Sequence, residues 1–198
     1  MVVSLADYVH MFVMKMPLSK CNRLMFFLFS ILIFMSGCNE SSETTSANKP
    51  AVNLIEACTR NDIAAVEGHI SNKSDLDQTD DKGSTPLMIA SSFGHTEIVK
   101  ALIDAGAYMD KQNKDGTTAL HIAAFMCEKE IVQLLLDAGV DKSAKDNTGS
   151  TALQSVEAPY MLVKPIYDFL ATALAPVGFT MDYKKIKTMR PEIAKMLR

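Results

Sequence analysis

The sequence predicts an all-α protein, a solenoid of about four helix–turn–helix repeats joined by loops and β-turns, followed by a C-terminal helical extension. The first observation is a segment that recurs at a fixed interval. Residues 80–90 (DDKGSTPLMIA) return 33 residues later as 113–123 (NKDGTTALHIA), and the beginning returns after another 33 as 146–153 (DNTGSTAL). A constant period of this size indicates stacked repeats. The second observation is that the apolar residues within each unit follow helical spacing.

The second repeat is the most complete. Thr85 and Pro86 open a predicted helix whose apolar positions continue to Phe93. A Gly-His turn follows at 94–95, because glycine readily takes positive φ at the end of a helix. The next predicted helix spans 96–104, with one broad apolar stripe. A loop from 107 to 115 then leads to the next repeat.

The other repeats depart from this order to different degrees. The third repeat, 113–141, follows it nearly as well, with a departure at the turn. The first is degenerate but in register and lacks the Thr-Pro opening, as a terminal repeat facing water can. The fourth starts regularly, and we expect its second helix at 166–174, after an insertion at 159–165, as the C-terminal cap. In the extension we expect a helix at 191–197 that seals the stack or contacts a partner.

These residues resemble the ankyrin repeat. Its pattern D-x-x-G-x-T-P-L-H-x-A-A, a G-H turn, an E-I-V-x-x-L-L helix and a closing G-A is met almost throughout by 80–108 and 113–141, and the resemblance covers about 51–170. It implies that His95 and His121 occupy structural hydrogen-bonding positions. Cys127 replaces the turn glycine of the third repeat and no histidine follows it. This replacement predicts a turn that is either different or strained.

The N-terminus carries a predicted targeting segment. A 12-residue apolar run at 24–35 follows three basic residues and is too short to span a bilayer as a helix. Residues 35–38 (MSGC) resemble the lipobox of bacterial lipoproteins, which implies a lipid on Cys38. The alternative is an uncleaved signal anchor with an incidental cysteine. Residues 39–50 are rich in Ser and Thr and predict a flexible linker with a span of about 20 Å.

The expected organisation has four parts. A signal peptide covers 1–37, with Met14 or Met16 as alternative starts. Cys38 and the linker cover 38–50, the repeat domain 51–175 and the extension 176–198. The expected location is the bacterial cell envelope, with the protein lipid-anchored and facing the periplasm or the cell surface.

The composition argues against several functional classes. Net charge is −3 with both signs interspersed, unlike the clustered basic face of a nucleic-acid-binding protein. No His or Cys pair has metal-site spacing and no nucleophile motif occurs, so we expect no enzyme activity, metal or cofactor. Cys58 and Cys127 stand two repeats apart, on the order of 20 Å, too far for a disulfide, and both are expected to be buried.

The loop tips carry a row of acidic residues. Asp80, Asp81, Asp115 and Asp146 fall at these tips. They predict a solvated polar row, and acid–base chemistry by paired carboxylates is the alternative.

The resemblance implies that a protein partner binds to the loop tips and to the concave face of the first helices. Phe93, Phe125 and Met126 are the expected apolar anchors, and the alternative is that they complete the core. The full set of predicted partner-binding residues is Asp81, Lys82, Ser84, Ser92, Phe93, Lys114, Asp115, Thr117, Phe125, Met126, Asn147, Thr148 and Ser150.

The predicted function is a non-enzymatic protein–protein interaction module tethered to the bacterial envelope, acting as a monomer without nucleic acid. Two alternatives stay open. One is a periplasmic immunity or inhibitor protein that blocks a toxin or lytic enzyme. The other is a structural or stress-related envelope factor that acts through the extension 176–198.

Overall fold

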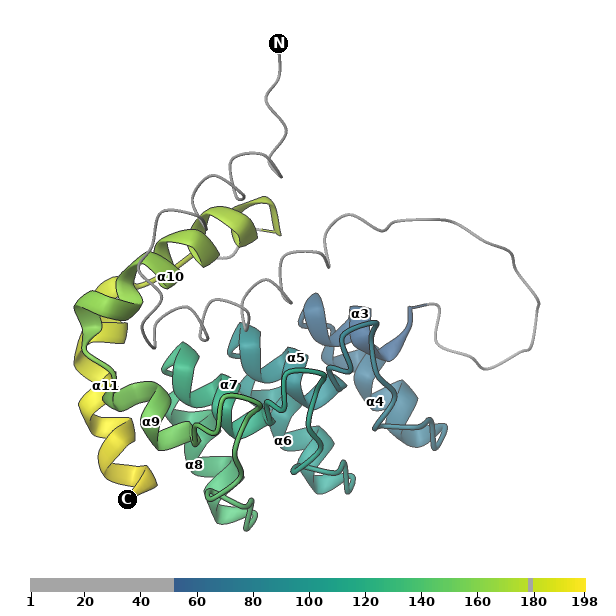
Figure 1. Ribbon diagram of the computed structural model, residues 1–198. Coiled ribbons are helices and arrows are strands. Elements are labelled where there is room, and N and C mark those ends of the chain that lie inside the picture. Colours follow the sequence, from purple (N-terminus) through teal and green to yellow (C-terminus); the bar gives the residue numbers. More distant parts are fainter. Residues whose placement is uncertain (1–51, 178–179) are drawn as a thin grey trace.

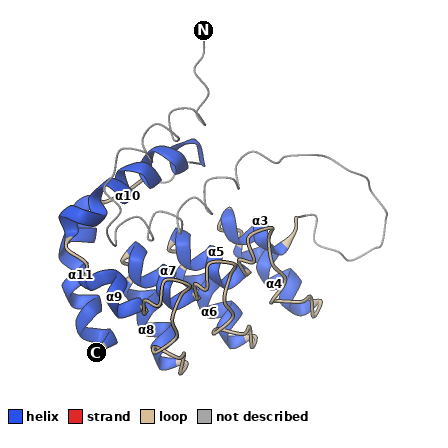
Figure 2. Cartoon of the chain, in the orientation of Figure 1, coloured by secondary structure: helices blue, strands red, loops and turns tan. Residues whose placement is uncertain are grey.

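A row of helix pairs forms the molecule and is closed at one end by two longer helices (Figure 1). The computed structural model describes residues 52–177 and 180–198. Within these residues no strand occurs, and loops and turns join the helices (Figure 2). The all-α solenoid with a helical extension is therefore confirmed. The predicted signal peptide, Cys38 and the linker lie outside the described residues.

Three complete helix pairs precede the closing end. They are α3 (Leu54–Thr59) with α4 (Ile63–Ser71), α5 (Pro86–Phe93) with α6 (Thr96–Asp104), and α7 (Ala119–Met126) with α8 (Lys129–Asp137). The first helix of the fourth repeat is α9 (Ala152–Glu157). First helices pack on first helices, from α3 through α5 and α7 to α9, and α4, α6 and α8 pack on one another in the same way.

Three threonines spaced by the repeat period begin the first helices. The side chains of Thr85, Thr118 and Thr151 each accept a hydrogen bond from the backbone N–H three residues on. These bonds satisfy donors that a helix leaves open at its start. At the other end, Gly94 has a φ of 74° and stops α5. The sequence pattern thus fixes the starts of α5, α7 and α9 and the end of α5.

The loop tips form a hydrogen-bonded row. In the third repeat, Oδ1 of Asn113 accepts from the backbone N–H of Asp115 at 3.0 Å and of Thr117 at 2.9 Å. Asp80 and Asp146 do the same in their repeats. Neighbouring tips are joined because the N–H of Lys114 donates to the carbonyl of Lys82 at 2.9 Å. The carboxylates of Asp80 and Asp146 therefore hold turns in place.

The core repeats with the sequence. At three positions of the repeat, the equivalent apolar residues of the first three repeats, 33 residues apart, are at most 1 % exposed. They form three layers: Leu54, Leu87 and Leu120; Ala57, Ala90 and Ala123; and Val66, Val99 and Val132. Each helix pair therefore buries its apolar stripe against its neighbours, as a solenoid requires.

The C-terminal end differs from the prediction. A helix, α10 (Tyr160–Leu174), covers the expected insertion 159–165 as well as 166–174, and the short 3₁₀ helix η2 (Ala175–Val177) follows it. The helix that packs against both α9 and α8 is α11 (Tyr183–Leu197). The expectation that 166–174 forms the second helix of the fourth repeat was therefore wrong. That position belongs to α11, which begins eight residues before the expected start at Pro191.

A buried arginine joins α11 to the rest of the stack. Arg190 is 4 % exposed. Its guanidinium donates to Oη of Tyr167 at 2.9 Å and to the carbonyls of Ser155 and Ala158 at 3.0 and 2.7 Å. Tyr167 in turn donates to the carbonyl of Phe125 at 2.6 Å. One side chain thus connects α11 with α9, α10 and, through Tyr167, α7.

No helix in the described part of the chain combines the length and the apolar character that crossing a bilayer requires.

Candidate partner-binding surface

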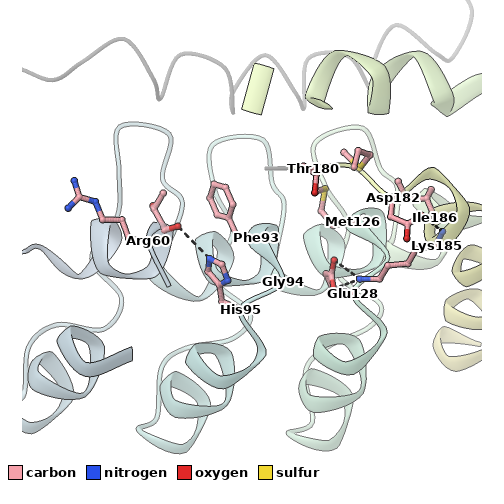
Figure 3. Close-up of a pocket in the computed structure, with 12 residues that line it drawn as sticks. Arg60, Phe93, Gly94, His95, Met126, Glu128, Thr180, Asp182, Lys185 and Ile186 are labelled. Atoms are coloured by element: carbon pink, nitrogen blue, oxygen red, sulfur yellow. Dashed lines mark hydrogen bonds and ion pairs between the residues drawn. The ribbon is translucent and has the colours of Figure 1, made fainter. Parts of the chain in front are cut away.

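A groove follows the C-terminal ends of the first helices. Its volume is about 800 Å³, and Figure 3 shows its lining side chains. Three successive helix ends contribute one wall, and the segment that leads into α11 closes the other. We call this the helix-end groove; it is lined by Thr59, Arg60, Phe93, Gly94, His95, Met126, Glu128, Thr180, Met181, Asp182, Lys185 and Ile186.

Phe93 and His95 form the middle of the helix-end groove. Their rings stack with centroids 5.8 Å apart and an interplanar angle of 12°. Nε2 of His95 lies 3.4 Å from the carbonyl of Thr59 at the end of α3, so the side chain links two repeats. Burial lowers the pKa of His95, against the opposing effects of this hydrogen bond and of Glu128. The predicted structural role of His95 is confirmed.

The third repeat replaces the Gly-His turn by Cys127 and Glu128. Cys127 keeps the left-handed conformation with a φ of 61°, so this turn has the usual shape with a residue that disfavours it. Glu128 forms an ion pair with Lys185 of α11, with Nζ and Oε2 2.8 Å apart. The departure from the repeat pattern therefore coincides with a docking point for α11. Glu128 and Lys185 were not among the predicted binding residues, although the missing histidine in the sequence marked this turn as different.

The three predicted apolar anchors do not share one surface. Phe93 and Met126 both line the helix-end groove, although Met126 is only 6 % exposed. Phe125 is 7 % exposed, and its ring stacks on Tyr167 of α10 with centroids 4.8 Å apart. Phe125 therefore belongs to the core, as the alternative interpretation had it, and Phe93 is the most accessible of the three.

The predicted loop-tip residues form a second surface. They precede the N-caps of the first helices, whereas the helix-end groove follows their last residues. The intervening helices α5 and α7 have eight residues each, a length of about 12 Å. The predicted binding surface is thus divided into two regions at opposite ends of the first helices.

Accessibility varies among the predicted loop-tip residues. Asp81, Lys114 and Asn147 are exposed, whereas Thr117 is fully buried. The others are half-buried: Lys82, Ser84, Asp115, Thr148 and Ser150. Ser92, on the helix itself, is also half-buried and donates to the carbonyl of Ile89 at 2.8 Å. A partner at the loop tips would therefore contact the exposed side chains first.

Two predicted loop-tip residues have a buried polar side-chain atom without a hydrogen-bond partner in the described part of the chain. These atoms are Nζ of Lys82 and Oγ1 of Thr117. Burial lowers the pKa of Lys82, while the charges of Asp80 and Asp115 oppose this shift.

His121 lies in the repeat position that the family pattern assigns to histidine. Nδ1 is 2.8 Å from Oγ1 of Thr118, and Nε2 is 3.1 Å from the carbonyl of Ser150 in the next repeat. Burial lowers its pKa, against the hydrogen bond to Ser150 and the charge of Asp146. Its predicted structural role is confirmed.

The remaining reactive side chains have structural surroundings. Cys58 and Cys127 are free and buried, as expected. Burial raises the pKa of Cys58 to about 12 and that of Cys127 to about 11, which makes both thiols poor nucleophiles. His69 is buried, with Nε2 2.8 Å from the carbonyl of Val52. Among residues 52–177 and 180–198, no group of three or more His, Cys, Asp or Glu could hold a metal ion.

Comparison with known proteins agrees with this architecture. Residues 54–146 match the family model for ankyrin repeats in three copies. No curated protein matches the chain. The matched segment spans α3 to α8 and ends before α9, so the closing helices lie outside it. Residues 54–146 are therefore ankyrin repeats, and they form a protein–protein interaction module.

Proposed function

We propose that this protein is anchored to the bacterial envelope through Cys38 and binds a protein partner in the helix-end groove, with the exposed loop-tip residues as a second contact. The observation that carries the binding proposal is the lining of the groove. Phe93 offers an apolar ring at its centre, and Arg60, Glu128 and Lys185 surround it with charge. An apolar centre with a polar rim is the usual composition of a protein interface.

Co-purification tests the binding proposal. The lipidated chain is extracted from envelopes in mild detergent and compared with a Phe93→Ala variant. A matched control is Tyr108→Ala, since Tyr108 is 59 % exposed and does not line the helix-end groove. We expect a discrete partner with the wild type and with the control, and at least a tenfold loss with Phe93→Ala. Equal recovery with all three chains would contradict binding in the groove.

The anchoring proposal is supported by the lipobox-like sequence that ends at Cys38 and by the polar segment that follows it. We expect a Cys38→Ala chain to lose incorporation of labelled palmitate and to leave the membrane fraction. Labelling that persists in Cys38→Ala would contradict lipidation at this residue. Because binding is measured separately, either half of the proposal can fail without the other.

The captured partner distinguishes the alternatives. A lytic enzyme or toxin whose activity falls on binding would indicate a periplasmic inhibitor, whereas a structural envelope protein would indicate a scaffold. Deleting residues 176–198 is a poor test of a role for the extension. Ile186, Ile193 and Leu197 are buried, so the deletion would expose the end of the core. Substitutions on the exposed face of α11 are the suitable test.

A further inference from the structure

Charge is distributed unevenly along the described chain. Residues 182–198 contain six Lys and Arg against two Asp and Glu, whereas residues 52–181 contain ten against eighteen. Figure 1 shows that α11 forms one end of the solenoid and α3 the other. A basic helix at the end of an acidic body gives the solenoid a charge dipole. Anionic surfaces therefore attract the α11 end and repel the rest of the body.

Three lysines form the exposed basic stripe of α11. Lys184, Lys187 and Lys195 are exposed. Lys187 and Lys195 follow Lys184 by three and eleven residues, which places all three on one side of the helix. Within the described residues, none of the three takes part in an ion pair, whereas Lys185 pairs with Glu128 and Arg198 with Glu157. We call Lys184, Lys187 and Lys195 the α11 stripe.

The acidic residues of α11 are already engaged. Asp182 accepts from the backbone N–H groups of Lys184 and Lys185 at the start of the helix. Glu192 lies 3.9 Å from Nζ of Lys129. Glu192 is the one acidic residue within α11 itself, and the three lysines of the α11 stripe outnumber it, so the stripe keeps a net positive charge.

Exposed apolar side chains lie beside the same end. At the first turn of α10, Met161 is 77 % exposed and Leu162 is 56 % exposed. Ala158, two residues before α10 begins, accepts from Arg190 of α11 at 2.7 Å, so α10 begins at the α11 end of the solenoid. Exposed apolar residues combined with lysines are typical of helices that lie in a membrane interface.

We propose that the α11 stripe, together with Met161 at the same end of the solenoid, docks on an anionic phospholipid surface. The inference rests on the proposed envelope location, which would place such a surface near the domain. The described chain begins at the α3 end, so the linker and the α11 stripe would hold opposite ends of the solenoid. The repeats would then lie along the membrane. An acidic protein or a nucleic acid would satisfy the lysines but would leave Met161 without an apolar contact.

The strength expected of this contact suits a tethered protein. Each lysine close to an anionic bilayer raises partitioning by about fivefold, so three lysines raise it by about a hundredfold. That is weak for a free domain. It is sufficient for a domain that an anchor already holds near the surface, because the second contact is then intramolecular. The effect falls away within a Debye length of about 10 Å at 0.1 M salt.

Lysine footprinting on vesicles tests the proposal. The chain from Cys38 onward is coupled through that thiol to a maleimide lipid. Cys58 and Cys127 are buried, so they react slowly with the maleimide. Every described residue of the buried core lies between 54 and 197, so a chain that starts at Cys38 retains this core. Acetylation rates are measured on phosphatidylcholine vesicles and on vesicles with added phosphatidylglycerol. We expect the α11 stripe to be acetylated at least fivefold more slowly on the anionic vesicles. The exposed loop lysines Lys73, Lys142 and Lys145 serve as internal references.

Two variants and a salt step complete the test. Lys187→Glu should abolish the protection of Lys184 and Lys195, whereas the matched loop variant Lys142→Glu should retain it. Thermal unfolding of each variant verifies the fold. Protection should also vanish in 0.5 M salt. Equal rates on both kinds of vesicle, or protection only by an added polyanion such as heparin, would overturn the proposal. Coupling Cys38 chemically keeps this outcome independent of lipidation in cells and of any protein partner.

Discussion

His121 connects two repeats through its two ring nitrogens. Nε2 faces the carbonyl of Ser150 and therefore donates to it, while Nδ1 lies 3.4 Å from the backbone nitrogen of Thr118 and accepts from it. This pair of bonds requires the neutral imidazole. In the second repeat, Met88 occupies the same position, and its sulfur accepts from the N–H of Thr85 at 3.5 Å. The histidine thus adds a link between repeats that the methionine cannot provide.

The lowered pKa of His121 predicts a loss of stability in mild acid. Its folded pKa lies below the ordinary 6.5 because of burial. As the pH falls through 6.5, the unfolded chain gains a proton that the folded chain does not, so the free energy of unfolding decreases. We expect His121→Gln to be less stable at pH 7.5 but to lose less stability between pH 7.5 and 5.5, as measured by urea unfolding. His95, shifted in the same direction, should leave a residual slope. Equal slopes would contradict this role.

Alanine substitutions at two loop-tip glycines distinguish the cost of backbone strain from the cost of a close contact between neighbouring tips. Gly116 and Gly149 have φ values of 75° and 81°. A Cβ on Gly116 would lie 2.7 Å from the backbone N of Asn147, whereas a Cβ on Gly149 would meet nothing within 4 Å. Gly149→Ala should therefore cost about 1–2 kcal/mol from φ alone. Gly116→Ala should cost at least about 1 kcal/mol more, because the neighbouring tip must move. Equal losses in urea unfolding would mean that the tips are not tightly stacked.

At the scale of elements, α11 is held by a polar network as well as by apolar packing. Arg190→Leu would leave the carbonyls of Ser155 and Ala158 without their donor, and each buried unpaired group costs about 1–3 kcal/mol. We expect a total loss near 3 kcal/mol in urea unfolding. Arg190→Lys keeps the charge but not the planar fork of donors and should lose less. A change below about 0.5 kcal/mol in Arg190→Leu would show that apolar packing alone holds α11.

Most elements could be predicted from the sequence, and the exceptions are informative. The helices 86–93 and 96–104 follow from a threonine cap, a turn glycine and an apolar stripe, all of them local signals. The closing helices were predicted only in part, at 166–174 and 191–197, because each continues through a proline, Pro165 in α10 and Pro191 in α11. A proline inside a helix typically costs about 3 kcal/mol. Long-range burial of residues such as Tyr167 and Ile186 offsets that cost, and a local pattern does not reveal it.

The sequence predicted part of the candidate site within the repeats and none of the part that the closing helices form. Phe93 lies in the helix-end groove, where the family pattern implied a binding face. Phe125 occupies a repeat position of the same face but is covered by Tyr167, which comes from α10. The wall formed by Asp182 and Lys185 comes from the part of the chain beyond the ankyrin match. Of the predicted partner-binding residues, only Phe93 and Met126 line the groove, and the closing helices supply its other wall.

At the scale of the whole molecule, the two ends of the solenoid differ. The α3 end leads to the predicted linker and the proposed anchor. The α11 end carries the basic stripe, and the helix-end groove extends between them across the C-terminal ends of the first helices. If both ends contact the membrane as proposed, the groove has a fixed orientation relative to the bilayer. A partner in the same envelope would then meet the groove without a search over all orientations.

Photo-crosslinking from Phe93 tests the central claim most directly. A benzoylphenylalanine placed at 93 in the full chain is irradiated in intact cells, with the same residue at Tyr108 as the control. We expect one discrete protein adduct from position 93 and none from position 108. Adducts from position 108 alone, or none from position 93 in a stably folded chain, would contradict partner binding in the helix-end groove.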